Sequence, residues 1–190
     1  MKKVWIDIKV WIEGNAPHLL NYLGPPASIQ DLQNFESKLG IRLSEGFKEF
    51  YMVHNGQINE SECLIYEHTI LPLKRILSEW KVKTDLLNEG EFIYDGVIAT
   101  SDPDPGIKND WWNAKWIPVT SDGCGDNFCI DMDPDDGGRV GQIISMWHDA
   151  GWRELKSNSF EDWLTQYAND LVQGQYTYEE GVGIWKTETN

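Results

Sequence analysis

Apolar residues in the first part of the chain recur mainly at the spacing of amphipathic helices. Residues 4–13 fit two periods, because their apolar residues alternate as in a strand while Trp5, Ile8 and Ile12 also share one helical face. The sequence Asn15-Ala16-Pro17 that follows is typical of a helix end and a new helix start. We therefore predict a helix at residues 4–13.

Three further helices begin at residues that suit helix starts. Ser28 is a good N-terminal cap, and Asp31 follows three residues later, where a carboxylate complements the exposed N–H groups. Gly40 stands where a left-handed C-terminal cap belongs. Ser44 is expected to cap the second of these helices, and Pro72 to open the third.

After residue 100 the period changes to that of strands. Four strands are predicted there, at residues 116–119, 127–132, 142–147 and 152–155, and two short strands are predicted earlier, at residues 64–66 and 97–100. Ser159 is expected to cap a closing helix. Helices followed by consecutive strands predict an α+β fold, in which an antiparallel meander is packed by N-terminal helices and one C-terminal helix.

The length of 190 residues fits one domain, and no linker or repeat divides the chain. We expect this domain to cover residues 1–172, with a helical leader at residues 1–24. Residues 173–190 show no period, so we expect a loosely held tail that Trp185 could anchor.

The composition restricts the classes of partner that the protein is expected to bind. Hydrophobic residues make up 41% of the chain and include ten Trp, which indicates a globular core. The net charge of −15 repels nucleic acid and anionic membranes and attracts basic proteins. Solubility alone is the alternative explanation for this charge.

The cysteines and the N-terminus indicate a compartment. Cys63, Cys124 and Cys129 form no CxxC pair, and the first residues do not form a secretory leader. No apolar run approaches the roughly 18 residues that a membrane span needs. We therefore expect a cytoplasmic protein.

Asp131, Asp133 and Asp135 have the spacing of the first three ligands in a calcium loop. The pattern then fails, because Asp136 stands where the loop needs glycine and Gln142 where it needs glutamate. A solvated turn at a strand end explains the same residues. A small divalent-metal-dependent enzyme that uses Asp131 and Asp133, as in the DxD motif of sugar transferases, stays as an alternative, although the chain has no glycine-rich phosphate loop.

Cys124 and His148 are the candidate nucleophile and base. No third residue that would orient the base can be assigned, and a small buried thiol is the commoner role for cysteine. Zinc held by Cys124, Cys129 and His148 would lack a fourth ligand. We therefore expect no catalysis, no metal site and no cofactor.

Three segments follow one another in an order that carries a family resemblance. They are PPASIQDLQNFESKLGIRLSEGFKEFYMVHNG, a helix pair; KWIPVTSDGCGDNFCIDMDP with GGRVGQIISMWHD, a glycine-centred strand pair; and SNSFEDWLTQYANDL, a closing helix. Together they cover most of residues 24–172 and resemble the SUKH superfamily, which contains the fungal Smi/Knr-type cell-wall synthesis regulators and many bacterial relatives. The segment WIDIKVWIEGNAPHLLNYLG is similar to the Knr-type leader. Ser44 departs from the family's usual proline, and the chain after Leu171 has no counterpart.

The resemblance implies an α+β domain without known catalytic residues that binds a protein partner. Bacterial members are typically immunity proteins that neutralise toxins, often nucleases, and fungal members are regulators and scaffolds of cell-wall glucan synthesis. The short chain fits the bacterial type better, so a toxin immunity protein is the first hypothesis. A regulatory scaffold of the glucan synthesis type is the alternative.

An immunity protein would bind a basic toxin domain through an acidic face. Aromatic residues amid charges are typical of interface hot spots, so Trp111 or Trp112 is the expected anchor. The acidic and polar residues predicted on this face are Asp122, Asp126, Asp131, Asp133, Asp135, Asp136, His148 and Asp149. An equal alternative for Asp126 and Asp131 is a structural role, in which they cap the amides of the turn at residues 123–125.

Overall fold

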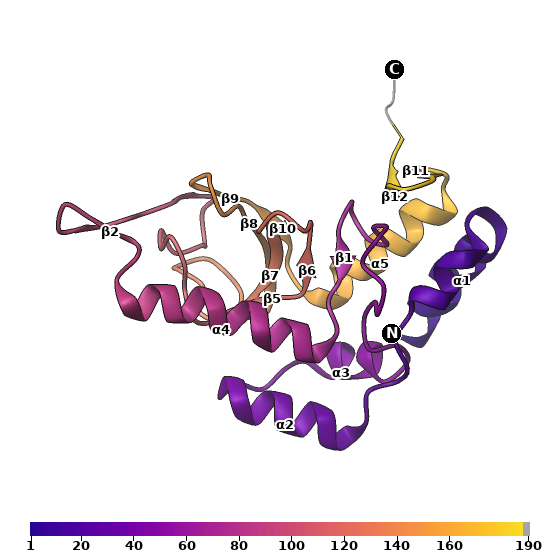
Figure 1. Ribbon diagram of the computed structural model, residues 1–190, viewed down its shortest axis with the longest axis horizontal. Helices are drawn as coiled ribbons and strands as arrows, with labels where there is room; N and C mark the ends of the chain where they lie inside the picture. The colour runs from indigo at the N-terminus through magenta and orange to yellow at the C-terminus, as the bar shows by residue number, and fades with distance from the viewer. Residues whose placement is uncertain (188–190) are drawn as a thin grey trace. The chain divides into compact units, whose positions relative to one another are not determined.

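The computed structural model describes residues 1–187, and the chain divides into two compact units (Figure 1). The terminal unit consists of Met1–Leu73 and the chain from Glu161 onward, and the sheet unit consists of Lys74–Phe160. Helices and an antiparallel sheet are both present, which confirms the α+β prediction. One domain over residues 1–172 stays a prediction.

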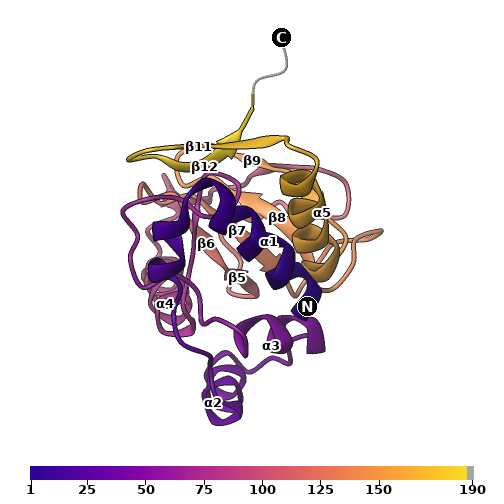
Figure 2. The same cartoon turned by 90° about the vertical axis from the view of Figure 1, so that its right-hand side faces the viewer.

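The terminal unit is built mainly from helices (Figure 2). Its elements are α1 (Lys2–Asn15), η1 (Pro17–Tyr22), α2 (Ile29–Leu39), α3 (Glu45–Tyr51), β1 (Thr69–Ile70), α5 (Phe160–Val172), β11 (Tyr176–Glu179) and β12 (Gly183–Lys186). The predicted first helix is confirmed, and its buried face contains Trp5. The Trp5 indole N–H donates to the Phe50 carbonyl at 2.9 Å, and the two rings stack with centroids 4.5 Å apart.

The predicted helix caps are confirmed in the terminal unit. The Ser28 hydroxyl accepts from the Asp31 N–H, while the Asp31 carboxylate accepts from the Ser28 N–H, so the two residues form a capping box. Gly40 ends α2 in the left-handed conformation with φ 64°. Ser44 caps α3 by accepting from the Phe47 N–H at 3.1 Å.

Two sequence predictions in the terminal unit were wrong. Strands β11 and β12 pair in an antiparallel hairpin, so residues 176–186 are ordered, where a loosely held tail was expected. Fully buried Ile184 fixes the hairpin by donating its N–H to the Cys63 carbonyl at 2.9 Å. Residues 64–66 do not form the predicted strand, because Tyr66 and Glu67 adopt positive φ in a turn that pairs Ile65 with His68.

The sheet unit combines one long helix with an antiparallel meander of strand order β10-β8-β7-β5 (Figure 1). Its elements are α4 (Leu73–Glu89), β2 (Ile93–Tyr94), β3 (Val97–Ile98), β4 (Asp102–Pro103), β5 (Trp116–Pro118), β6 (Thr120–Ser121), β7 (Asn127–Asp131), β8 (Gln142–Met146), β9 (Trp152–Arg153) and β10 (Leu155–Ser157). The register places Cys129 opposite both Pro118 and Ile144. Trp80 and Leu87 of α4 pack on a buried cluster that includes Trp112 and Trp116.

The predicted strand at residues 152–155 is divided into two elements by its partners. Trp152 and Arg153 pair with β4 in parallel, whereas Leu155 pairs with β8 in antiparallel fashion. This change of partner brings the chain after β8 to the edge of the meander. None of the helices among residues 1–187 is long and apolar enough to cross a membrane.

Candidate protein-binding site

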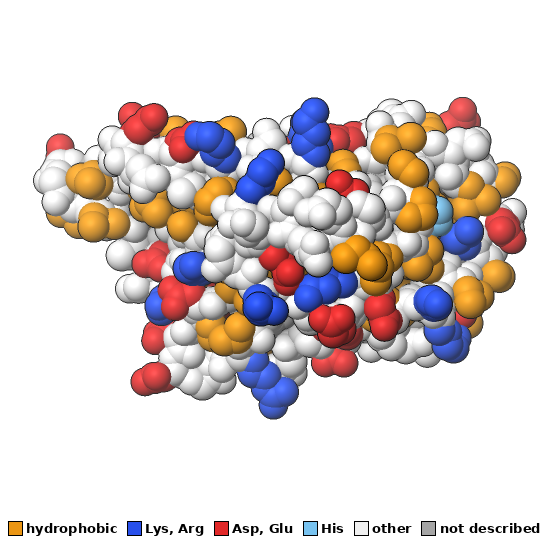
Figure 3. All heavy atoms as spheres, turned by 90° about the horizontal axis from the view of Figure 1, so that it is seen from below, with side chains coloured by type: hydrophobic (Ala, Val, Ile, Leu, Met, Phe, Trp, Pro, Cys, Tyr) orange, Lys and Arg blue, Asp and Glu red, His pale blue; other side chains and the backbone are white. Residues whose placement is uncertain are grey.

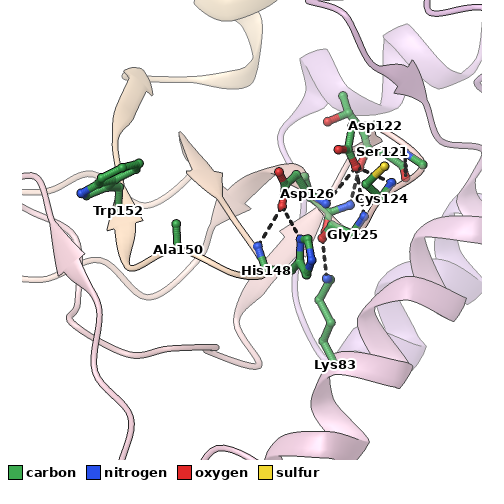
Figure 4. Close-up of polar contacts among 12 residues, drawn as sticks. Lys83, Ser121, Asp122, Cys124, Gly125, Asp126, His148, Ala150 and Trp152 are labelled. Atoms are coloured by element: carbon green, nitrogen blue, oxygen red, sulfur yellow. Dashed lines mark hydrogen bonds and ion pairs between the residues drawn. The ribbon is translucent and has the colours of Figure 1, made fainter.

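The loop between β6 and β7 is organised by one carboxylate. Asp122 Oδ1 accepts hydrogen bonds from the backbone N–H groups of Cys124, Gly125 and Asp126, at 2.8, 3.0 and 2.9 Å (Figure 4). Three amide donors on one oxygen make Asp122 a structural cap of the glycine turn. The alternative role considered for Asp126 and Asp131 therefore belongs to Asp122.

Asp126 joins the glycine loop to the chain that follows β8. Its Oδ1 accepts from the backbone N–H of His148 at 2.8 Å and lies 2.8 Å from His148 Nδ1 (Figure 4). Gly125 adopts φ 121°, and a Cβ atom there would lie 3.0 Å from His148 Cγ. The positive φ favours glycine at this position, and a side chain here would also crowd the His148 ring.

Lys83 supports the same loop from helix α4. Its Nζ donates to the Gly125 carbonyl at 2.9 Å and lies 5.9 Å from the centre of the Trp112 ring (Figure 4). Burial lowers the pKa of Lys83 below its ordinary value. This role could not be predicted from the sequence, because a lysine on a mostly polar helix surface has the same pattern as a solvated lysine.

The residues with calcium-loop spacing are engaged elsewhere. Asp131 is fully buried; it accepts from the Asp133 N–H and from Gln142 Nε2, both at 2.9 Å. Burial raises the pKa of Asp131, whereas hydrogen bonding to Lys108, 2.7 Å away, lowers the pKa of Asp133. Within residues 1–187, Asp131, Asp133 and Asp135 do not form a group whose oxygens converge on one cation position.

A different group has ligand atoms close enough to hold a metal ion. Asp126, His148 and Asp149 each offer one such atom, and these atoms lie within 4.8 Å of one another. Asp126 and His148 are already bonded to each other, which leaves Asp149 as the carboxylate that faces solvent. Cys129 of the zinc set considered above is fully buried in β7, and burial raises the pKa of its thiol to about 12.

A surface hollow of about 420 Å³ lies beside this group, in the chain that runs from β8 to β10. Its lining residues are Trp147, Asp149, Ala150, Trp152 and Glu154. Trp152 is 64% exposed, which is unusual for a tryptophan. Strand alternation directs Trp152 and Glu154 outward and Arg153 inward. Figure 4 shows the Trp152 indole on the far side of Ala150 from His148.

Buried Arg153 holds the backbone around this hollow. Its NH1 group donates to the carbonyls of Ala150 and Trp152, both at 2.7 Å, and its NH2 group donates to the Trp111 carbonyl at 2.9 Å. The guanidinium also lies over the rings of Trp111 and Trp116, 5.3 and 5.9 Å from their centres. Burial lowers the pKa of Arg153 to about 10.

The structure separates the residues that were predicted to share one acidic face. Asp131 and Trp112 are buried, so neither can contribute to a docking surface. Asp122, Asp126, Asp133 and Trp111 are half-buried, and the exposed ones are Asp135, Asp136, His148 and Asp149. On the face drawn in Figure 3, Lys and Arg side chains lie among Asp and Glu side chains.

Of the two tryptophans predicted as the anchor, Trp112 is buried and Trp111 is half-buried. Trp112 donates its indole N–H to Thr84 at 3.3 Å, and Trp111 lies against Arg153, whereas Trp152 is the exposed member. The charged sequence Arg153-Glu154 that follows Trp152 is no guide to this exposure, because Arg153 is itself fully buried.

The fold is that of an α+β domain. Most of the candidate carboxylates accept structural hydrogen bonds, and a hollow lined by two tryptophans is open to solvent. A model of the SMI1 / KNR4 family (SUKH-1) matches residues 26–166. The chain belongs to this family.

Curated relatives cover nearly the whole chain. It is 25% identical over 210 residues to a Neurospora crassa protein named "Glucan synthesis regulatory protein", with 93% of this chain and 39% of the relative covered. It is 25% identical over 186 residues to the Schizosaccharomyces pombe "Cell wall biosynthesis/cell cycle regulator smi1", with 93% and 37% covered. The Saccharomyces cerevisiae "Cell wall assembly regulator SMI1" is 21% identical over 204 residues, with 90% and 40% covered. The chain thus spans well under half the length of these three relatives.

Proposed function

We propose that this chain is a non-catalytic regulatory domain that binds protein partners, of the kind that regulates cell-wall glucan synthesis. The observation that carries the proposal is the match of 93% of the chain to a relative named as a glucan synthesis regulator. The three relatives described above are named as regulators, and none of the three is named as an enzyme or as an immunity protein. This favours the scaffold alternative over the toxin-immunity hypothesis.

The chemistry of the site supports a binding role. Asp122 and Asp126 each accept hydrogen bonds that fix loops, and Asp131 is buried in the sheet. Carboxylates used in this way are poor general bases, because a base must reach the proton of a bound substrate. Within residues 1–187 none of the three cysteines is joined in a disulfide, as is usual in a reducing compartment such as the cytoplasm.

A chimera tests this function. Because the chain spans 40% of the Saccharomyces cerevisiae relative, it should replace the matched segment within that protein and not the whole protein. The readout is the glucan content of the cell wall in a strain that lacks the native regulator. We expect the chimera to restore glucan, whereas the relative with the segment deleted does not. A chimera that accumulates normally but behaves like the deletion would contradict the proposal.

A further inference from the structure

Trp152 presents an exposed indole on a backbone that is fixed on both sides. The Gly151 carbonyl accepts from the Asp102 N–H at 2.7 Å, and the Arg153 carbonyl accepts from the Asp104 N–H at 2.8 Å. The Trp152 carbonyl itself is held by Arg153. A binding group that is already ordered loses little conformational entropy when a partner docks. The fold therefore holds the large apolar side chain of Trp152 in solvent on an ordered backbone.

The hollow beside Trp152 combines aromatic and acidic walls. Two of its lining residues are tryptophans and two are carboxylates, with Ala150 between them. Glu154 forms an ion pair with Lys156 at 2.7 Å, so its negative charge is partly neutralised. Among the described residues the Asp149 carboxylate is exposed and makes no ion pair, and the whole chain carries a net charge of −15. The hollow thus complements a group that is flat, apolar on its faces and positively charged.

An arginine side chain has these properties. Its planar guanidinium stacks on indole rings and binds a carboxylate through two parallel hydrogen bonds. Lysine fits less well, because its ammonium is a strongly hydrated point charge without a flat face. The chain uses the same pairing internally, since the Arg153 guanidinium lies 5.3 Å from the centre of the Trp111 ring.

We propose that the hollow lined by Trp147, Trp152 and Asp149 is the docking site for a partner protein, and that it takes an arginine side chain from an exposed segment of that partner. The indole of Trp152 stacks on the guanidinium, and Asp149 binds its N–H groups. Glu154 adds negative charge at the rim. This inference rests on the proposed function, since it names the kind of partner that the regulatory domain binds.

The test uses N-acetyl-arginine methylamide as the probe, with the indole N–H signals of the protein followed by NMR. The citrulline analogue is the matched neutral control, and the lysine analogue tests the preference for guanidinium. A Trp152→Phe variant assigns the Trp152 signal. We expect the Trp152 and Trp147 signals to move with the arginine probe, to move much less with citrulline or lysine, and to return as salt is raised.

Two variants make the assignment specific. Asp149→Asn should weaken binding of the arginine probe by up to about fivefold, the upper end of the effect of losing one exposed ion pair. Asp136→Asn removes an exposed carboxylate of the same unit outside the hollow and should leave the affinity unchanged. Equal shifts with arginine and citrulline, or no shift at Trp152, would overturn the docking site. Equal affinity for the lysine probe would overturn the assignment to arginine.

The probe experiment and the chimera experiment test the docking site and the proposed function separately. If the arginine probe binds at Trp152 but the chimera does not restore glucan, the docking site stands and the proposed function is wrong. If the chimera restores glucan and the probe leaves Trp152 unmoved, the function stands and the docking site is wrong.

Discussion

The guanidinium of Arg153 lies over the ring of Trp111 and donates to the carbonyl of the same residue at 2.9 Å. One side chain thereby links two loops that are about forty residues apart in sequence. The same guanidinium holds the carbonyls of Ala150 and Trp152. The position of the exposed Trp152 therefore depends on a residue that is itself fully buried.

Replacing Arg153 with Met should lower the free energy of unfolding by about 2–4 kcal/mol, because three carbonyls lose a charged donor inside the protein. Urea denaturation measures the change. The matched control is Arg139→Met, whose side chain is exposed and which should differ from wild type by less than about 0.5 kcal/mol. Equal stability of the Arg153 variant and the control would contradict the role given to Arg153.

Gly125 and Gly123 form a matched pair for testing the contact between the two loops. Both adopt positive φ, at 121° and 85°, but only a Cβ at Gly125 would meet His148. Gly123→Ala should therefore cost about 1 kcal/mol of backbone strain, and Gly125→Ala about 1–3 kcal/mol more. Thermal unfolding of both variants gives the comparison. Similar melting temperatures would show that the loops do not pack as described.

Removal of the Asp122 carboxylate should loosen the glycine turn. Asp122→Ala leaves three amides without their acceptor, so we expect a loss of about 2 kcal/mol, whereas Asp122→Asn keeps a carbonyl oxygen and should lose less. Hydrogen exchange of the amides at residues 124–126 is the direct readout. Slow exchange in the Ala variant would show that contacts other than those of Asp122 hold the turn.

Helix caps could be predicted from the sequence because they are local. Ser28 and Asp31 are three residues apart and bond to each other. Distant partners left no comparable signal: Ile184 bonds to Cys63, and Arg153 bonds to Trp111. The acidic run showed that carboxylates gather near the glycine turn, but not that Asp122 caps it while Asp131 is buried. Burial depends on register, and one residue of difference along a strand reverses the face.

The ion pair between Asp133 and Lys108 should make stability depend on acid pH. Bonding to Lys108 and Asn113 lowers the pKa of Asp133 below its ordinary value of 3.8, so the unfolded chain binds the proton more readily than the folded one. The contribution is fully present above pH 3.8 and is lost as pH falls through the folded pKa. In denaturation measured at each pH, Asp133→Asn should thus differ from wild type at pH 7, and the difference should disappear as the pH falls through the folded pKa, below 3.8. A constant difference would contradict the shift.

Divalent cations separate a binding domain from a metal-dependent enzyme. We expect magnesium, manganese and calcium to bind the group of Asp126, His148 and Asp149 with dissociation constants above about 0.1 mM, because the site is open and already bonded internally. Isothermal titration measures this, with Asp149→Asn as the control. Micromolar binding that disappears in the control would contradict the non-catalytic proposal.

Regulation through the hollow at Trp152 is tested by two chimeras of the Saccharomyces cerevisiae regulator, one with this chain and one with its Trp152→Ala variant. Trp152 is an exposed side chain, so its removal should leave the fold and the amount of protein unchanged. We expect normal cell-wall glucan with the first chimera and a clear deficit with the second. Equal glucan content in the two strains would contradict regulation through this hollow, and a deficit in both would contradict the regulatory function itself.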